Sequence, residues 1–340
     1  MRADHHQTHI ELSLDVTDEA VDWIRTLLAA TTYQGDVNVI SYVPQAGKAA
    51  SEWSFTVRLY LPNDGGVAAQ VESIQKQLSA LHRTGQTSDL QMAIVDQIPV
   101  LTTPTDSTSV HHVGQRFIIL KPNSPYQPTE NQIAIYLRSS LAFGSGLHPA
   151  TNLILQLIEH YTTSGMQVLD LGSGSGILSV AMAKLGSQVL ALDNDVVSVA
   201  ATEEAIALNH VTTQVTARAG SLGAGNTLGH WMGGDVVHGA DAADVTYQFD
   251  LTQQFDLIAA NILARVHIAI APDYQHALRL GGILLTAGFT EDYEPDLTAA
   301  LEAAGFRRID VAQTGVWMAI AYQLTTRPSS SPSPSAGRVA

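Results

Sequence analysis

The chain has 340 residues, with 17 basic and 32 acidic side chains, and its formal net charge at pH 7 is −15. A surface of this sign repels the phosphates of nucleic acids and attracts basic proteins, so we expect a basic protein partner and no direct nucleic-acid substrate. The chain contains no cysteine, which excludes disulfides and cysteine-ligated zinc.

The length and the apolar content predict a soluble protein of two domains. Hydrophobic residues make up 45% of the chain, which is enough to form buried cores. The N-terminal residues lack the apolar segment of a signal peptide, and no apolar run reaches the length of a membrane span. We therefore expect a cytoplasmic protein without membrane contact, and a monomer, because a recognition domain is part of the chain.

Histidines occur in two groups that resemble metal ligands only superficially. They are interpreted as exposed polar residues, because neither group has the carboxylates or the helical spacing of a metal site. We therefore expect no metal. The two groups are His5, His6 and His9, and the pair His111 and His112.

Residues 9–97 have the pattern of a small domain in the order strand, helix, strand, strand, helix, strand. The first strand alternates apolar and polar residues, and each helix carries apolar residues on one face. This order is typical of a ferredoxin-like α+β sandwich, and we assign residues 1–98 to substrate recognition because they contain no catalytic cluster. The predicted strands are 9–16, 36–43, 53–61 and 90–98, and the predicted helices begin at Asp18 and Val67.

The remaining chain divides by composition into a linker, a second domain and a tail. Residues 99–115 begin with a stretch rich in proline, threonine and serine and are predicted to be a linker. The second domain spans 116–326 and includes a predicted insertion, 220–254, which is either a surface loop or a mobile lid. Residues 327–340 are rich in serine and proline and are predicted to form a disordered tail.

The second domain is organised around residues 168–195, which predict one βαβ unit of a parallel sheet. A short apolar strand ends at the turn Gly172-Ser-Gly174-Ser-Gly, an alanine-rich helix follows, and the next strand ends at Asp193. Glycines at a strand end let a ligand approach the backbone, and an acid after the next strand can accept hydrogen bonds from ribose hydroxyls. The segment therefore predicts a nucleoside-binding site, although a turn without any ligand is the simpler alternative.

Two classes of cofactor use such a unit. Dinucleotide sites have the spacing G-x-G-x-x-G, whereas this chain has G-x-G-x-G preceded by Asp170. The carboxylate of Asp170 would repel a pyrophosphate but attract the sulfonium and ammonium groups of S-adenosylmethionine. We therefore expect S-adenosylmethionine, with Asp193 on the ribose and Gly172 and Gly174 beside the methionine part.

After this unit, strands and helices continue to alternate as far as residue 324. Together with 168–171 and 189–192 these make seven predicted strands in the second domain. The expected fold class of this domain is therefore a seven-stranded, doubly wound, Rossmann-like α/β sheet, preceded by the small ferredoxin-like α+β domain. Trp317, in the last of these strands, is expected in the core. The further strands are 214–219, 255–260, 282–287, 306–312 and 317–324, and the helices are 196–209, 268–278 and 293–304.

The segment 141–151, LAFGSGLHPAT, precedes a helix with an apolar face. Two glycines beside Phe143 predict a loop that can cover a cofactor, and Pro149 suits a first helical turn. Thr151 lies near the start of the helix, where its hydroxyl can face a ligand. Three roles stay open for His148: it can cap the helix, orient the loop or assist proton removal.

Four motifs occur in this order after the small N-terminal domain: LAFGSGLHPAT, LDLGSGSGILSVAMAKLG, LALDND and FDLIAANILA. Together they resemble the PrmA family, the ribosomal protein L11 methyltransferases. The resemblance is specific from about residue 116 to residue 324 and rests on the order of the elements before that. It implies a class I methyltransferase domain that uses S-adenosylmethionine.

The resemblance also implies roles for individual residues. Thr151, Gly172 and Asp193 fall on cofactor contacts of the family, and Phe143 lies in the covering loop. Asn261, the asparagine of the N-I-L-A motif, falls on the residue placed near the transferred methyl and is the expected catalytic residue. An asparagine after a strand can instead close an Asx turn, so this alternative stays open for Asn261.

In function, the resemblance implies transfer of methyl groups from S-adenosylmethionine to lysine side chains and α-amino groups of ribosomal protein L11. One alternative is a class I methyltransferase that acts on a different protein or on a small molecule. Another is a ribosome-assembly factor that binds the cofactor without turnover. The joint presence of Thr151, Gly172, Asp193 and Asn261 argues against the second alternative.

Overall fold

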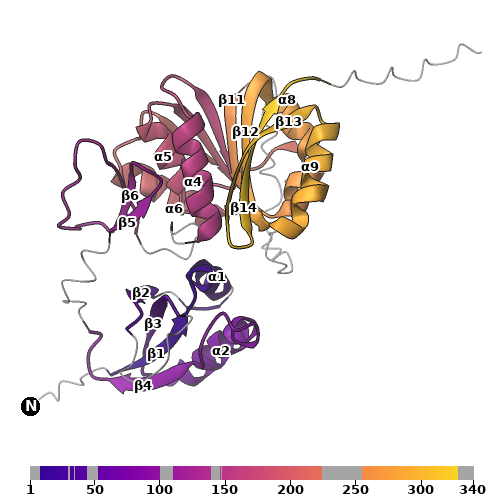
Figure 1. The fold of residues 1–340 in the computed structure, drawn as a ribbon. Helices are drawn as coiled ribbons and strands as arrows, with labels where there is room; N and C mark the ends of the chain where they lie inside the picture. Colours follow the sequence, from indigo (N-terminus) through magenta and orange to yellow (C-terminus); the bar gives the residue numbers. More distant parts are fainter. Residues whose placement is uncertain are drawn as a thin grey trace, which may run out of the picture.

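The computed structural model describes residues 8–29, 31–33, 35–43, 53–99, 110–138, 146, 148–223 and 255–327. Their strands form three sheets, of four, three and seven strands, which follow one another along the chain (Figure 1). The predicted insertion from residue 224 and the predicted tail from residue 328 lie outside the described residues. Within the described part, no helix is both long and apolar enough to cross a membrane.

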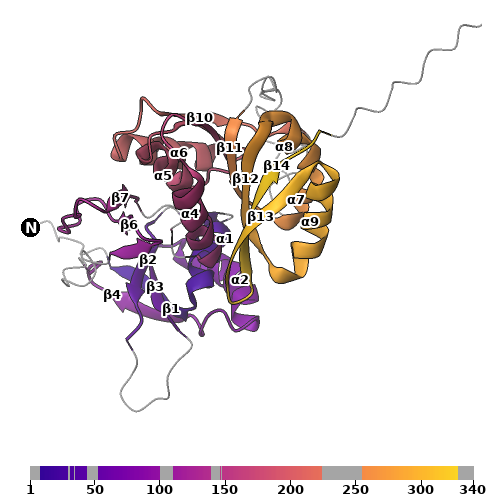
Figure 2. The same cartoon turned by 45° about the horizontal axis from the view of Figure 1, so that its top comes forward.

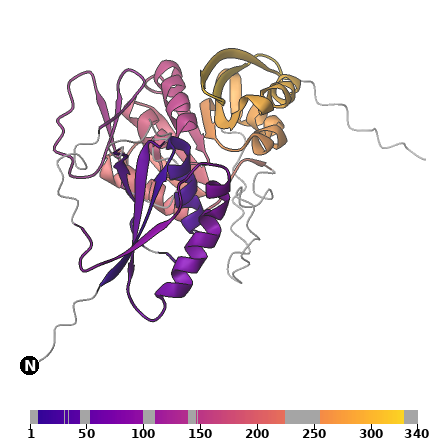
Figure 3. The same cartoon turned by 60° about the horizontal axis from the view of Figure 1, so that its bottom comes forward.

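The first sheet is antiparallel, with the strand order β2-β3-β1-β4. Every second residue of β1 is buried, because one face of the sheet packs on two helices with apolar faces. Figure 3 shows these helices side by side against the sheet. The elements are β1 (His9–Val16), α1 (Asp18–Ala29), β2 (Asn38–Ser41), β3 (Phe55–Pro62), α2 (Val67–Arg83) and β4 (Gln91–Val95), so β2 and β4 are shorter than predicted.

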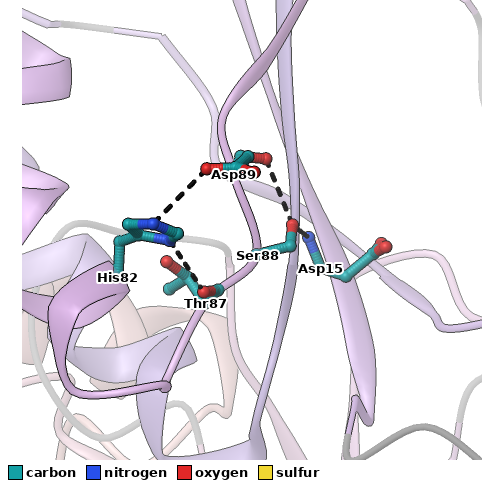
Figure 4. A network of polar contacts seen from close by, with 5 residues as sticks. All are labelled: Asp15, His82, Thr87, Ser88 and Asp89. Atoms are coloured by element: carbon teal, nitrogen blue, oxygen red, sulfur yellow. Dashed lines mark hydrogen bonds and ion pairs between the residues drawn. The ribbon is translucent and has the colours of Figure 1, made fainter.

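A polar network holds the loop between α2 and β4 against β1 (Figure 4). Nδ1 of His82, in the last turn of α2, lies 3.3 Å from the carbonyl oxygen of Thr87, and its Nε2 lies 3.3 Å from a carboxylate oxygen of Asp89. The hydroxyl of Ser88 accepts a hydrogen bond of 2.8 Å from the backbone N–H of Asp15. The loop is therefore tied both to the helix before it and to the central strand of the sheet.

The second sheet is small and comes between the two larger sheets in the order of the chain. It consists of β5 (His111–Val113), β6 (Phe117–Leu120) and β7 (Ile133–Tyr136), with β5 antiparallel and β7 parallel to β6. Residues 111–113 were predicted as linker, but they form a strand because they pair with β6 and bury Val113. Residues 100–109 of that predicted linker lie outside the described residues.

The third sheet has seven strands in the order β10-β9-β8-β11-β12-β14-β13; β14 runs antiparallel to both of its neighbours, and all other neighbouring pairs are parallel. Side chains that alternate along the strands form two apolar clusters, one packed on α4, α5 and α6 and the other on α7, α8 and α9. Figure 2 shows these two groups of helices on opposite sides of the sheet. The strands are β8 (Gln167–Leu171), β9 (Gln188–Asp193), β10 (Val215–Ala219), β11 (Phe255–Asn261), β12 (Leu278–Thr290), β13 (Phe306–Thr314) and β14 (Trp317–Leu324).

The helices of this domain differ from the prediction at one place. The predicted helix 268–278 is two short helices that meet at Ile270, because Pro272 lies in the first turn of the second helix and cannot continue a helix from before it. Strand β12 then begins at Leu278, which pairs with Phe255, and is longer than predicted. The helices are α4 (Pro149–Tyr161), α5 (Ile177–Lys184), α6 (Val196–Leu208), α7 (Ala264–Ala269), α8 (Ala271–Ala277) and α9 (Glu294–Ala303).

Candidate active site

Three polar side chains project from the same face of the sheet, near the carboxyl ends of three adjacent parallel strands. Asp170 lies on β8, and Asp193 and Asn261 end β9 and β11. Each is an even number of residues beyond an apolar residue of the cluster that packs on α4, α5 and α6, so each points to that side. All three are buried. This edge of an open parallel sheet is where ligands bind in α/β proteins.

The glycine-rich turn after β8 packs closely on the chain beside it. The N–H of Gly172 donates a hydrogen bond of 2.8 Å to the carbonyl of Leu192 at the end of β9. Gly172 has a φ of +76°, and a Cβ at this position would lie 2.5 Å from Cγ2 of Ile262. Only glycine fits both the conformation and the space, so the turn brings its backbone directly beside the residue that follows Asn261.

Asp193 is held by the backbone on both of its carboxylate oxygens. Oδ2 accepts a hydrogen bond of 2.9 Å from the N–H of Gly174, and Oδ1 accepts one of 2.9 Å from the N–H of Asp195. These bonds join the glycine-rich turn to the loop after β9. The carboxylate is therefore fixed between the two loops that the sequence associates with a nucleoside.

Asp170 is the most deeply buried acid of the site. Its Oδ2 accepts a hydrogen bond of 2.5 Å from the hydroxyl of Ser179 on α5, while its Oδ1 is buried and receives no hydrogen bond from the described residues. The pKa of Asp170 is raised to about 7, mainly by burial and also by the nearby charge of Asp193, against the opposing effect of the bond from Ser179. A cation bound beside Asp170 would favour its ionised form.

His148 caps the helix that carries Thr151. Its Nδ1 accepts a hydrogen bond of 3.1 Å from the N–H of Ala150, and Pro149 follows in the first turn of α4. The ring of Trp317 on β14 meets the His148 ring edge-to-face, with 4.4 Å between ring centres. Of the three roles left open for His148, the structure shows the capping of the helix. Trp317, predicted as core, packs on the core cluster and also on this cap.

A second side chain ties the start of α4 to the preceding loop and to β5. Nδ2 of Asn152 donates to the carbonyl oxygens of Gly146, at 2.9 Å, and His148, at 3.2 Å. Its Oδ1 accepts a hydrogen bond of 3.1 Å from Nε2 of His111. The interpretation of His111 as an exposed residue is therefore wrong, because this bond holds it partly buried against α4. Phe143 lies outside the described residues.

Thr151 and Asn261 are brought into direct contact. Nδ2 of Asn261 donates a hydrogen bond of 3.1 Å to Oγ1 of Thr151. Oδ1 of Asn261 is buried and has no hydrogen-bond partner among the described residues. The side chain therefore does not close an Asx turn, the alternative that the sequence left open. It presents an unsatisfied acceptor, which costs free energy unless a ligand donates to it.

The site thus combines a buried acid, a second acid held between two loops, a close-approach glycine turn and a buried amide oxygen without a donor. These groups can accept hydrogen bonds from a nucleoside and from a positively charged or amine-bearing ligand. The fold and this site define a Rossmann-like α/β domain of the methyltransferase class.

The comparison with known proteins identifies the family. The model of the family described as ribosomal protein L11 methyltransferase (PrmA) matches residues 8–325. The chain therefore belongs to the PrmA family.

Individual relatives agree with this membership. The chain is 37% identical over 322 residues to the ribosomal protein L11 methyltransferase of Chloroflexus aurantiacus, a match that covers 92% of this chain and 97% of the relative. The enzyme of that name from Herpetosiphon aurantiacus is 37% identical over 321 residues, with 92% and 98% covered. A crystal structure of a ribosomal protein L11 methylase from Lactobacillus delbrueckii subsp. bulgaricus is 29% identical, with a TM-score of 0.52, and the match covers 64% of this chain and 99% of that one.

Proposed function

We propose that the chain transfers methyl groups from S-adenosylmethionine to lysine side chains and the α-amino group of ribosomal protein L11. Membership of the PrmA family and the names of its full-length relatives support this substrate. The observation that carries the proposal is the pair Asn261 and Thr151, which aims an unsatisfied amide oxygen into the ligand-binding edge of the sheet.

The residues present fit the proposed cofactor. Asp193, fixed by two backbone N–H groups, would accept hydrogen bonds from the ribose hydroxyls. Gly172 and Gly174 would lie beside the methionine part, and the buried oxygen of Asp170 would face its positive charge. Thr151 and, from the covering loop, Phe143 would complete the contacts. When bound, S-adenosylmethionine supplies a methyl group that is activated by its sulfonium charge.

The chain's own contribution to the chemistry is to present a neutral amine to that methyl group. Neutralising an α-amine of pKa near 7.7 at pH 7 costs about 1 kcal/mol, whereas neutralising a lysine of pKa near 10.4 costs roughly 4.6 kcal/mol. A buried site lowers the cost for lysine, because burial disfavours the ammonium form. Oδ1 of Asn261 would accept an N–H of the neutral amine and orient its lone pair, a positioning effect that accelerates bimolecular reactions strongly.

The N-terminal part of the chain supports a role in recognition. Its four-stranded sheet with two helices fits a ferredoxin-like domain of residues 1–98, and the net charge of −15 suits a basic protein substrate. We further propose that residues 116–326 form the catalytic domain, with 220–254 as an insertion and 327–340 as a disordered tail. In this proposal the enzyme acts in the cytoplasm as a monomer.

Mass spectrometry of ribosomal protein L11 after incubation with the enzyme and S-adenosylmethionine tests the proposal. We expect mass gains in steps of one methylene group, and their loss with Asn261→Ala. Peptide mapping then identifies the modified amines. If the wild-type enzyme binds S-adenosylmethionine in calorimetry but adds no methyl group, the proposed substrate is wrong and a different protein or small molecule takes its place.

A further inference from the structure

A histidine behind the active site has no part in the contacts described above. His267, on α7, lies six positions after Asn261 in the chain and is fully buried. Its ring meets Phe289 edge-to-face, with 5.9 Å between ring centres, and lies 6.0 Å from the ring of Tyr274. A buried polar side chain in such an apolar environment requires hydrogen-bond partners on both nitrogens.

Both ring nitrogens of His267 have a partner, and the partners define its hydrogen position. Nε2 lies 3.0 Å from the carbonyl oxygen of Ala287, which can only accept, so Nε2 carries the hydrogen. Nδ1 lies 2.9 Å from the hydroxyl of Tyr274 and accepts its hydrogen. Burial lowers the pKa of His267 to about 4, against the opposing effect of its backbone hydrogen bonds. The ring is therefore neutral at pH 7 and keeps this arrangement.

The carbonyl oxygen of Ala287, which accepts the hydrogen bond from His267, also accepts one from the backbone beside Asn261. The N–H of Ile262, the residue directly after Asn261, donates to the same oxygen of Ala287 at 3.0 Å. Asn261 itself stands opposite Ala287 in the register of β11 and β12. One carbonyl of β12 thus accepts one hydrogen bond from the start of the turn after Asn261 and another from a side chain of α7, the helix into which that turn leads.

We propose that His267 is a positioning residue for Asn261, which acts through the Ala287 carbonyl and the Ile262 peptide to fix the turn that aims the Asn261 amide. The proposal rests on the proposed function, in which Asn261 orients the amine. His267 does not touch the reactants in this proposal. Without the Nε2–H donor, α7 is no longer bonded through this side chain to β12. The turn before α7 is then less constrained, so the Asn261 amide adopts orientations in which it does not contact the amine.

The variants separate the hydrogen bonds of His267 from its volume. His267→Leu keeps an apolar side chain of similar size and removes both bonds, whereas His267→Gln keeps an N–H donor and an oxygen acceptor. Tyr274→Phe removes only the hydroxyl that binds Nδ1. The matched control is Tyr322→Phe. Tyr322 is fully buried in the same core cluster as Tyr274, but its hydroxyl is hydrogen-bonded to the hydroxyl of Thr298, at 2.8 Å, and not to His267.

Two measurements are made on each full-length variant. The first is hydrogen exchange of the Ile262 amide by NMR without cofactor, which reports on the turn itself. The second is kcat and the KM for S-adenosylmethionine with ribosomal protein L11, because a positioning effect lowers kcat while the cofactor contacts keep KM. We expect His267→Leu to lose about tenfold in Ile262 protection and about tenfold in kcat, with KM within about threefold of the wild type.

Ile262 protection and kcat are compared among the variants to test the positioning role of His267. His267→Gln is expected to stay within about threefold of the wild type in both measurements, and Tyr322→Phe to leave both unchanged. If His267→Leu does not fold, a loss in Tyr274→Phe that is absent from Tyr322→Phe supports the proposal. Wild-type protection and kcat in His267→Leu, or equal losses in the two tyrosine variants, would overturn it. Loss of Ile262 protection in His267→Leu, together with a wild-type enzyme that does not methylate ribosomal protein L11, would support the positioning role and overturn the proposed function.

Discussion

The side-chain amide of Asn261 donates a hydrogen bond to the hydroxyl of Thr151, although the two residues are 110 positions apart in the chain. The bond joins the end of β11 to the first turn of α4, and the amide oxygen of Asn261 has no hydrogen-bond partner among the described residues. Four predictions follow from this contact and its neighbours.

Replacing Thr151 by valine should lower methyl transfer by about tenfold or more. The change keeps the shape of the side chain but leaves the buried Nδ2 of Asn261 without an acceptor, which costs about 1–3 kcal/mol or makes the amide rotate. Thr151→Ser keeps the hydroxyl and should retain most of the activity. Initial rates with ribosomal protein L11 test this, and equal rates for the valine and serine variants would contradict it.

Asp193→Ala should weaken the binding of S-adenosylmethionine about a hundredfold, because it removes the proposed acceptor for the ribose hydroxyls and the partner of the Gly174 N–H. Asp195→Ala is the matched control. The Asp195 side chain caps α6 through the N–H of Val197, so its loss should cost about 1 kcal/mol of stability while cofactor binding stays within about threefold. Calorimetric titration and thermal unfolding of both variants measure the difference. Similar losses of affinity would argue against a specific role for Asp193.

Asp170 should make the stability of the cofactor-free protein fall as pH rises. Its pKa is about 7 in the folded state and near 3.9 in the unfolded chain, so between these values the folded state holds a proton that the unfolded state has released. The favourable contribution is present at about pH 4 and is lost as pH rises through about 7. Asp170→Asn cannot ionise and should be more stable than the wild type at about pH 8, by at most about 4 kcal/mol, and similar to it at about pH 4. Urea unfolding at both pH values measures this, and a difference that does not change with pH would refute it.

Gly288→Ala should reduce both stability and activity. Gly288 has a φ of +92°, and a Cβ there would collide with the backbone of Ile262, the residue after Asn261. Gly281 also lies on β12 with a positive φ, of +84°, but nothing lies within 4 Å of its Cβ position. In both alanine variants, backbone strain should lower the free energy of unfolding by about 1 kcal/mol or more, and only Gly288→Ala should lose activity as well. Loss of activity in both would show that strain in β12, rather than contact with Ile262, is responsible.

The parts of the site that could be predicted from the sequence depend on local patterns. An apolar run followed by glycines and then a helix places the turn after β8, and the next apolar run, 189–192, ends at Asp193 and so places this acid at the carboxyl end of β9. The position of each group at the ligand-binding edge follows from this pattern, because parallel strands share that edge.

Contacts between distant segments could not be predicted in this way. Nothing in the pattern around Asn261 or Thr151 shows that the two side chains meet, and the bond between His111 and Asn152 depends on how β5 packs against α4. The sequence around His267 carries no signal for its role, because its partners, Tyr274 and Ala287, are brought to it only by the packing of a short helix. The break between α7 and α8 has a local signal in Pro272, because a proline cannot continue a helix even where the apolar period runs through it.

The contact between Trp317 and His148 also has a consequence for the order in which the enzyme becomes competent. A nascent chain emerges with its N-terminal residues first, and β14 inserts between β12 and β13 only after both of those strands have been made. Until then β12 has an open edge, and the cap of α4 lacks the ring that packs on it. We therefore expect the candidate site to be incomplete while the chain is still being synthesised, and methyl transfer to start only when β14 has joined the sheet.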